Sequence, residues 1–230
     1  MKACLFLALA GLVIPSSLEA GTLTGIVRAE GKPEAEQALS GGKYDTRKYK
    51  FVERINYAEL QDFVVYVEGS LSSKPALPEK PVVVDTRRIL QKGAVFTPHV
   101  LPVRVGTTVE WPNNDDIFHN VFSISETKTF DLELYKHPVI KSVTFDKAGR
   151  VDAFCSIHAK MHCIILVLEN PFFSTTDEKG RYTITNVPPG TYKLKAWHER
   201  LPSQVKEVVV PESGDVKVDF MLGIKNLPKY

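Results

Sequence analysis

Hydrophobic and polar residues alternate with a period of two along most of this chain, and long stretches with helical periodicity are scarce. In the segment 216–222 (VKVDFML), every second residue from Val216 to Leu222 is apolar, as a strand with one buried face requires. We expect strands of this kind at 22–27, 63–67, 103–111, 164–168, 182–184, 192–196 and 216–222. Turn residues separate them at the spacing typical of β-sandwiches. The pattern therefore predicts an all-β protein.

Two breaks divide this pattern into blocks. Residues 70–81 (SLSSKPALPEKP) are rich in proline and serine, cannot continue a sheet, and are typical of a connector. The pair Asn170-Pro171 marks the second break. The stretch between the breaks is about 90 residues long, which is enough for a compact unit of its own.

The first 20 residues form a block of another kind. They open with Lys2, continue with an apolar run at 3–14, and end in small or neutral residues before Gly21. The run is too short to span a bilayer, so residues 1–20 are expected to be a secretory signal peptide. The protein that remains is expected to be exported, without stable insertion in a membrane.

Composition changes this picture little. The chain has 230 residues, of which 43% are hydrophobic and 24% charged, and its formal net charge is +2. These values are typical of a globular protein with one large domain or two small ones. The near-neutral balance gives no reason to expect a nucleic-acid partner.

The stretch 154–163 (FCSIHAKMHC) concentrates side chains that bind soft metal ions. Because both flanks have strand-like patterns, Cys155, His158 and Met161 are expected on one tight loop between two strands. Thiolate, imidazole and thioether suit copper, and two histidines with one cysteine and a weak axial methionine make the blue-copper arrangement. The second histidine has to come from elsewhere, and His119 lies just before an apolar strand in 111–123 (WPNNDDIFHNVFS).

These motifs resemble the cupredoxins, the blue-copper family of plastocyanin and amicyanin, over residues 82–169. The similar features are Phe96-x-Pro98, Gly106-Thr107-Thr108-Val109, Asn113-Asn114, His119-Asn120-Val121 and the run C-x2-H-x2-M that starts at Cys155. The resemblance implies a Greek-key β-sandwich that holds one copper ion through His119, Cys155, His158 and Met161. It also implies that Asn120 and Ser156 join the two ligand loops by a hydrogen bond, a contact that orients metal ligands.

Other interpretations of the same stretch are open at this point. A helix would bring Cys155, His158 and His162 to one face for zinc, although the strand-like flanks disfavour it. A disulfide between Cys155 and Cys163 would consume the ligand thiolate. We expect instead that Cys163 is a buried free thiol and that His162 is an exposed residue at a strand end.

A second resemblance lies outside the copper motifs. The stretch TTDEKGRYTITNVPPGTYKLKA, which begins at Thr175, resembles the carboxypeptidase regulatory-like domains, which are small transthyretin-like β-sandwiches. Such domains begin with strands like GTLTGIV and FVVYVEG, which occur here before the copper motifs. We therefore expect a split sandwich, with its first strands and a connector at 21–79, the cupredoxin at 80–170 and the remaining strands at 171–230. The alternative is that 21–69 adds strands to the cupredoxin.

The resemblance implies that the protein is an exported one-electron carrier. Its redox partner would be a cytochrome or a dehydrogenase, and its location the bacterial periplasm or else the extracellular space. Copper handling or storage uses the same ligand types and is the first alternative. A surface interaction module with a degenerate metal site is the second. Paired H-x-H motifs, G-x-S-x-G, a phosphate-binding loop and H-E-x-x-H do not occur in the sequence, so we do not expect an enzyme.

Overall fold

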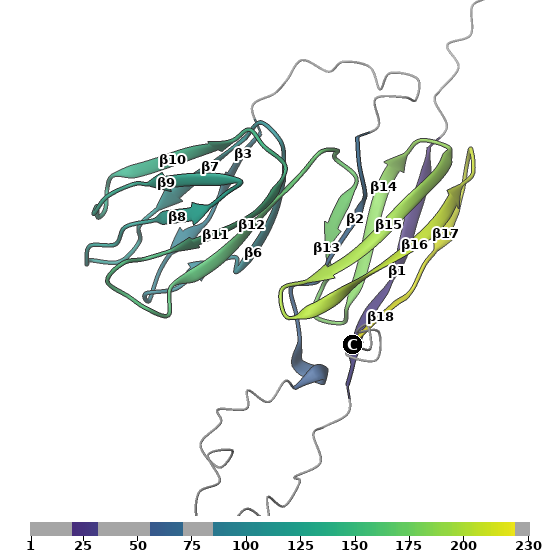
Figure 1. Ribbon diagram of the computed structural model, residues 1–230, viewed down its shortest axis with the longest axis horizontal. Coiled ribbons are helices and arrows are strands. Elements are labelled where there is room, and N and C mark those ends of the chain that lie inside the picture. The colour runs from purple at the N-terminus through teal and green to yellow at the C-terminus, as the bar shows by residue number, and fades with distance from the viewer. Residues whose placement is uncertain (1–19, 32–55, 71–84, 224–230) are drawn as a thin grey trace, which may run out of the picture.

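The computed structural model describes residues 20–31, 56–70 and 85–223, and these residues form two β-sandwiches side by side (Figure 1). Apart from one 3-10 turn, η2 (Tyr57–Glu59), every regular element described is a strand. The prediction of an all-β fold is therefore confirmed. No helix among the described residues is long and apolar enough to cross a membrane. The expected signal peptide at 1–20 lies almost wholly outside the described residues.

The first sandwich combines strands from both ends of the chain, and we call it the split sandwich. Its strands are β1 (Gly21–Glu30), β2 (Val64–Val67), β13 (Phe173–Thr175), β14 (Arg181–Val187), β15 (Gly190–His198), β16 (Leu201–Val210), β17 (Asp215–Lys217) and β18 (Phe220–Gly223). One sheet has the order β14-β1-β17, with β18 also paired to β1, and the other has the order β13-β2-β15-β16. Strands β1 and β2 thus pair with partners that follow residue 171.

The second sandwich, which we call the inner sandwich, comes from the residues between β2 and β13. Its strands are β3 (Thr86–Arg88), β4 (Leu90–Gln91), β5 (Phe96–Thr97), β6 (Val100–Arg104), β7 (Thr107–Pro112), β8 (Phe122–Ser125), β9 (Lys128–Asp131), β10 (Ile140–Phe145), β11 (Gly149–Phe154) and β12 (His162–Leu168). They form sheets of order β10-β7-β3 and β6-β12-β11-β8-β9, and a short β4-β5 pair.

Two expected strands are each two strands in the structure. The segment 103–111 turns at Gly106, whose φ of +89° favours glycine, so β6 pairs with β12 in one sheet and β7 with β10 in the other. The segment 216–222 is interrupted between β17 and β18, and both pieces pair with β1. Apolar and polar residues alternate regularly through both positions, so the sequence pattern gave no sign of either interruption.

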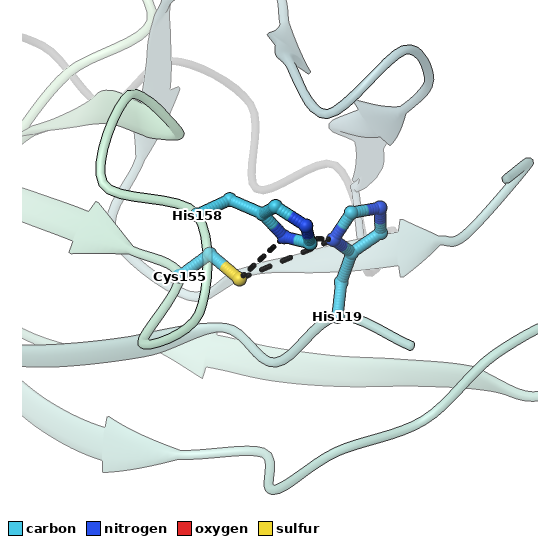
Figure 2. A group of neighbouring side chains, drawn as sticks. All are labelled: His119, Cys155 and His158. Atoms are coloured by element: carbon cyan, nitrogen blue, oxygen red, sulfur yellow. Dashed lines mark hydrogen bonds between the residues drawn. The ribbon is translucent and has the colours of Figure 1, made fainter. Parts of the chain in front are cut away.

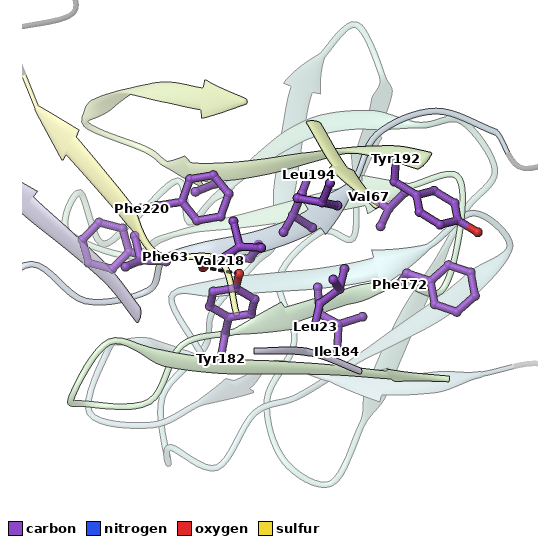
Figure 3. Close-up of a cluster of buried hydrophobic side chains, with 14 of the residues drawn as sticks. Leu23, Phe63, Val67, Phe172, Tyr182, Ile184, Tyr192, Leu194, Val218 and Phe220 are labelled. Carbon is purple, nitrogen blue, oxygen red and sulfur yellow. Dashed lines mark hydrogen bonds between the residues drawn. The ribbon is translucent and has the colours of Figure 1, made fainter. Parts of the chain in front are cut away.

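Each sandwich has its own apolar core. In the split sandwich, Leu23 on β1, Val67 on β2 and Leu194 on β15 are almost completely buried together (Figure 3). The same core takes in Tyr182, whose hydroxyl donates to the carbonyl of Val218 at 2.6 Å. Side chains from before and after the inner sandwich therefore share one interior, so the early strands depend on the late ones for burial.

A third apolar cluster joins the two sandwiches. It contains Val64 on β2, Val100 on β6, and Ile164, Leu166 and Leu168 on β12, all buried. Side chains of the split sandwich pack against it, among them Tyr66, Phe173 and Trp197. At its border the guanidinium of Arg150 lies over the Trp197 ring, 5.8 Å from the centroid. The sandwiches thus meet through a packed apolar contact.

His198, at the end of β15, is a buried titratable group in the split sandwich. Its ring is 4% exposed and lies 4.8 Å from the Phe63 ring, and its Nδ1 accepts the backbone N–H of Arg200 at 3.1 Å. Burial lowers the pKa of His198 below its usual 6.5, against the opposing effect of the Glu199 charge. The folded protein therefore favours the neutral ring.

We expect the pH dependence of the free energy of unfolding to include a contribution from the His198 ring. Since the unfolded chain binds the proton more readily, the free energy of unfolding should fall as the pH drops through about 6.5 towards the lower pKa of the folded state. In His198→Asn, whose side-chain oxygen can still accept the Arg200 N–H, this fall should be shallower. Urea unfolding between pH 8 and pH 5 measures both slopes.

The exposed His137 provides the control, since His137→Asn should keep the slope of the unchanged protein. Equal slopes in the His198 variant and the unchanged protein would show that this ring does not contribute.

Candidate metal centre

Three side chains that can bind a metal ion converge within the inner sandwich (Figure 2). Nδ1 of His119 and Nδ1 of His158 are 3.0 Å apart, and Sγ of Cys155 lies 4.0 Å from the first and 3.7 Å from the second. His119 is fully buried and Cys155 is 5% exposed, while His158 is partly exposed. The three donors therefore form a group that could hold a metal ion beneath the surface.

The donor spacing fits direct coordination. Metal bonds of about 2.0 Å to nitrogen and about 2.3 Å to sulfur, arranged in a trigonal plane, separate two nitrogens by about 3.5 Å and nitrogen from sulfur by about 3.7 Å. The nitrogen pair, at 3.0 Å, is closer than this, whereas one sulfur distance equals the value and the other, at 4.0 Å, is slightly longer. Small side-chain rotations would suffice to bind an ion between the three atoms.

His119 is held by contacts on both its backbone and its ring. Its backbone N–H donates to the carbonyl of Tyr135 and its carbonyl accepts the N–H of Tyr135, at 3.1 and 2.8 Å. On the far side of the ring, Nε2 lies 2.9 Å from Oδ2 of Asp115 and donates to it. The proton is therefore on Nε2, and the lone pair of Nδ1 points towards Cys155 and His158.

Asp115 is itself fixed by a tight turn between β4 and β5. Its two carboxylate oxygens accept the backbone N–H groups of Gly93 and Ala94 at 2.7 and 3.0 Å. Both residues have a positive φ, +64° and +53°, which aims successive N–H groups at one acceptor. The Ala94 N–H is the main cause that lowers the pKa of Asp115 to about 2, although burial opposes it. Asp115 is therefore a carboxylate at neutral pH.

The loop after β11 brings Cys155, His158 and Met161 together. The N–H of Met161 donates to the carbonyl of His158 at 2.9 Å, and the N–H of Cys155 donates to the carbonyl of Met161 at 3.2 Å. Met161 is 1% exposed and belongs to the same buried cluster as Cys155. The short loop therefore keeps the thioether on the buried side, in the same part of the core as the thiol.

A further contact links this loop to the segment of His119. Oδ1 of Asn120 accepts both the backbone N–H and the hydroxyl of Ser156, at 2.7 and 2.9 Å. Asn120 follows His119 and Ser156 follows Cys155, so the contact ties two donors that are far apart in sequence. It restrains their separation whether or not an ion is bound.

The other residues of the motif do not join this group. His162 opens strand β12 rather than a helix, and its Nε2 donates to Asp152 at 2.9 Å, so the helical zinc arrangement is absent from the described structure. Its ring is half-buried and stacked on Phe154, 4.8 Å between centroids, and is less exposed than expected. Cys163 is a free thiol in the core, and burial raises its pKa, as does the charge of Asp152.

Comparison with known proteins adds a family assignment for part of the chain. Residues 168–223 match the carboxypeptidase regulatory-like domain. This match confirms the second resemblance seen in the sequence, and the regulatory-like region supplies β13 to β18 of the split sandwich. None of the curated proteins matches the chain.

Solved structures that are similar to part of this chain were also found. A Cu-containing nitrite reductase from Thermus scotoductus SA-01 is 31% identical, with a TM-score of 0.37, over 44% of this chain; the chain spans only 26% of that protein. A reduced mutant of amicyanin is 24% identical, with a TM-score of 0.35, over 38% of this chain and 86% of its own. A purple cupredoxin from Nitrosopumilus maritimus is 27% identical, with a TM-score of 0.32, over 35% and 98%.

Asp115 was missed in the sequence, although a signal for it exists. It lies four residues before His119 in NNDDIFHN, next to Asp116, and only the fold distinguishes the two carboxylates. Asp116 is exposed, whereas the Asp115 side chain is 15% exposed and contacts the ring.

We expect Asp115→Ala to destabilise the metal-free protein by about 1–3 kcal/mol, because it leaves the buried Nε2–H of His119 without an acceptor. Metal affinity should fall about 10–100-fold, as for other outer contacts of ligand histidines. Urea unfolding of the apoprotein and competition with a chelator measure the two effects. Asp116→Ala is the matched control and should change neither; equal losses in the two variants would remove the special role of Asp115.

Proposed function

We propose that this chain is an exported copper protein that carries single electrons between redox partners. Its ligands would be His119, Cys155, His158 and Met161, which hold one ion. The observation that carries the proposal is the convergence of one thiol and two imidazole nitrogens within 4.0 Å of each other, with His119 and Cys155 buried and His158 partly exposed.

The donor set favours copper over other ions. Thiolate and thioether are soft ligands that suit Cu(I), imidazole suits Cu(II), and the combination suits both oxidation states. Copper, when bound, supplies a couple that takes up and releases one electron. The chain's part is to keep the donors in place: Asp115 orients His119, and Asn120 ties the two ligand segments together. Four donors from the chain would leave no open position for a substrate, which favours a carrier over an enzyme.

The surface around His158 fits brief contact with another protein. His158 is the partly exposed member of the group, and its neighbour Ile157 is 52% exposed. Phe118, next to His119, is 50% exposed. These apolar side chains would give a partner a small contact beside the ligands, and small contacts of this type release quickly, as electron transfer requires. The partner would be a redox protein such as a cytochrome or a dehydrogenase, met in the periplasm or outside the cell.

The first test uses the colour of the copper-loaded protein. With Cu(II) we expect an intense visible absorption band from the thiolate-to-copper contact, and Cys155→Ser should lose it completely because the thiolate is gone. Cys163→Ser is the matched control: it removes the other buried thiol and should keep the band. A colourless wild-type protein, or a coloured Cys155→Ser variant, would reject the proposed site.

A second measurement separates a carrier from a storage or handling protein. We expect one copper per coloured site and a reversible one-electron wave in voltammetry, because preformed ligands need little rearrangement between oxidation states. Several tightly bound copper ions without a reversible wave would favour storage instead.

A further inference from the structure

A second group of metal-binding side chains lies where the two sandwiches meet. His99, between β5 and β6, and His162, the first residue of β12, belong to the inner sandwich, and Glu199, in the turn after β15, belongs to the split sandwich. One ligand atom of each lies within 4.8 Å of the others. Their side chains are 35%, 26% and 22% exposed, so an ion can reach them from solvent.

The hydrogen bonds of His99 leave one nitrogen for a cation. Its Nδ1 is 3.2 Å from the carbonyl oxygen of His162, which can only accept, so this contact is a hydrogen bond in the tautomer that carries its proton on Nδ1. Nε2 lies 3.0 Å from Oε1 of Glu199, which is also an acceptor when ionised. In the neutral tautomer with its proton on Nδ1, the lone pairs of Nε2 and Oε1 face each other, and a metal ion bound by both atoms makes this arrangement favourable.

One ring nitrogen of His162 is likewise held by an acceptor. Its Nε2 donates to Oδ1 of Asp152 at 2.9 Å, which leaves Nδ1 as the nitrogen with a lone pair. Histidines that bind metal ions usually donate their other ring N–H to a carboxylate or a backbone carbonyl. His162 has the first kind of support and His99 the second. Stacking on Phe154 and an edge contact with His99, 5.4 Å between centroids, fix the His162 ring further.

We propose that His99, His162 and Glu199 bind a divalent cation of the zinc type across the boundary between the two sandwiches. Two imidazole nitrogens and a carboxylate oxygen are a ligand set for Zn²⁺, and three protein ligands with solvent access leave the fourth position to water. Because Glu199 comes from the split sandwich, the ion would hold the two sandwiches together. The site does not depend on the copper proposal, since the two groups share no side chain.

Calorimetric titration of the purified chain with Zn²⁺ tests this site. Zn²⁺ can also enter the group of His119, Cys155 and His158, so the decisive quantity is the difference between variants. We expect Glu199→Gln and His99→Gln each to bind one Zn²⁺ per chain fewer than the unchanged protein, or to bind it at least about tenfold more weakly. His137→Gln, which removes an exposed histidine elsewhere, should bind as the unchanged protein does.

Hydrogen exchange gives a second readout of the same site. Zn²⁺ should slow exchange in the turn between β15 and β16 of the unchanged protein and leave this turn unaffected in Glu199→Gln. If the unchanged protein, Glu199→Gln and His99→Gln bind the same number of Zn²⁺ ions with the same affinity, or if exchange in this turn does not respond to Zn²⁺, the three side chains do not form a metal site and the proposal is wrong.

Discussion

Strand β12 is buried on both faces, and the two sandwiches depend on it in different ways. Its odd-numbered residues, Cys163, Ile165 and Val167, fill the core of the inner sandwich, whereas the even-numbered Ile164, Leu166 and Leu168 form the contact with the split sandwich. Each large aliphatic side chain buried in this way contributes about 1.5–3 kcal/mol. A register slip of one residue would exchange the two faces. The pairing of β12 with β6 and β11 therefore also fixes the side to which the residues at its start point. Met161 points to the same side as the odd-numbered residues, and His162 points to the side of the even-numbered ones.

The first metal group illustrates how a site can be prepared by the apoprotein. His119 comes from the segment before β8, and Cys155 directly follows β11; the two strands touch through the pairing of Phe122 with Phe154. Pairing alone would bring the segments close, but it would not orient an imidazole ring. Asp115 does so for His119, and Asn120 sets the spacing of the two segments. Because folding already orders these side chains, binding an ion needs only small rotations of the ligand side chains.

The sequence indicated the fold class because period-two alternation reflects burial on one face, and the turn residues between the strands follow local preferences. It could not indicate the turn at Gly106, where alternation continues from β6 into β7 while the chain changes sheets. The ligand assignment rests on motif spacing and resemblance; the structure brings His119, Cys155 and His158 together, and the assignment of all four ligands stays a prediction. The contact of His99 with Glu199 joins residues 100 positions apart, and no local pattern encodes it.

The contact between the sandwiches has a consequence for the proposed electron carrier. It uses the even face of β12, which is opposite to the core that contains Cys155 and Met161. Asn170 reinforces it after β12, because its amide donates to the carbonyls of Val67 and Gly69 at 2.8 and 2.9 Å. The exposed fractions of Ile157 and Phe118 apply with both sandwiches in place, so the split sandwich leaves this surface open. The split sandwich therefore restrains the inner sandwich on the side opposite to His158. A redox partner could approach His158 without displacing the split sandwich.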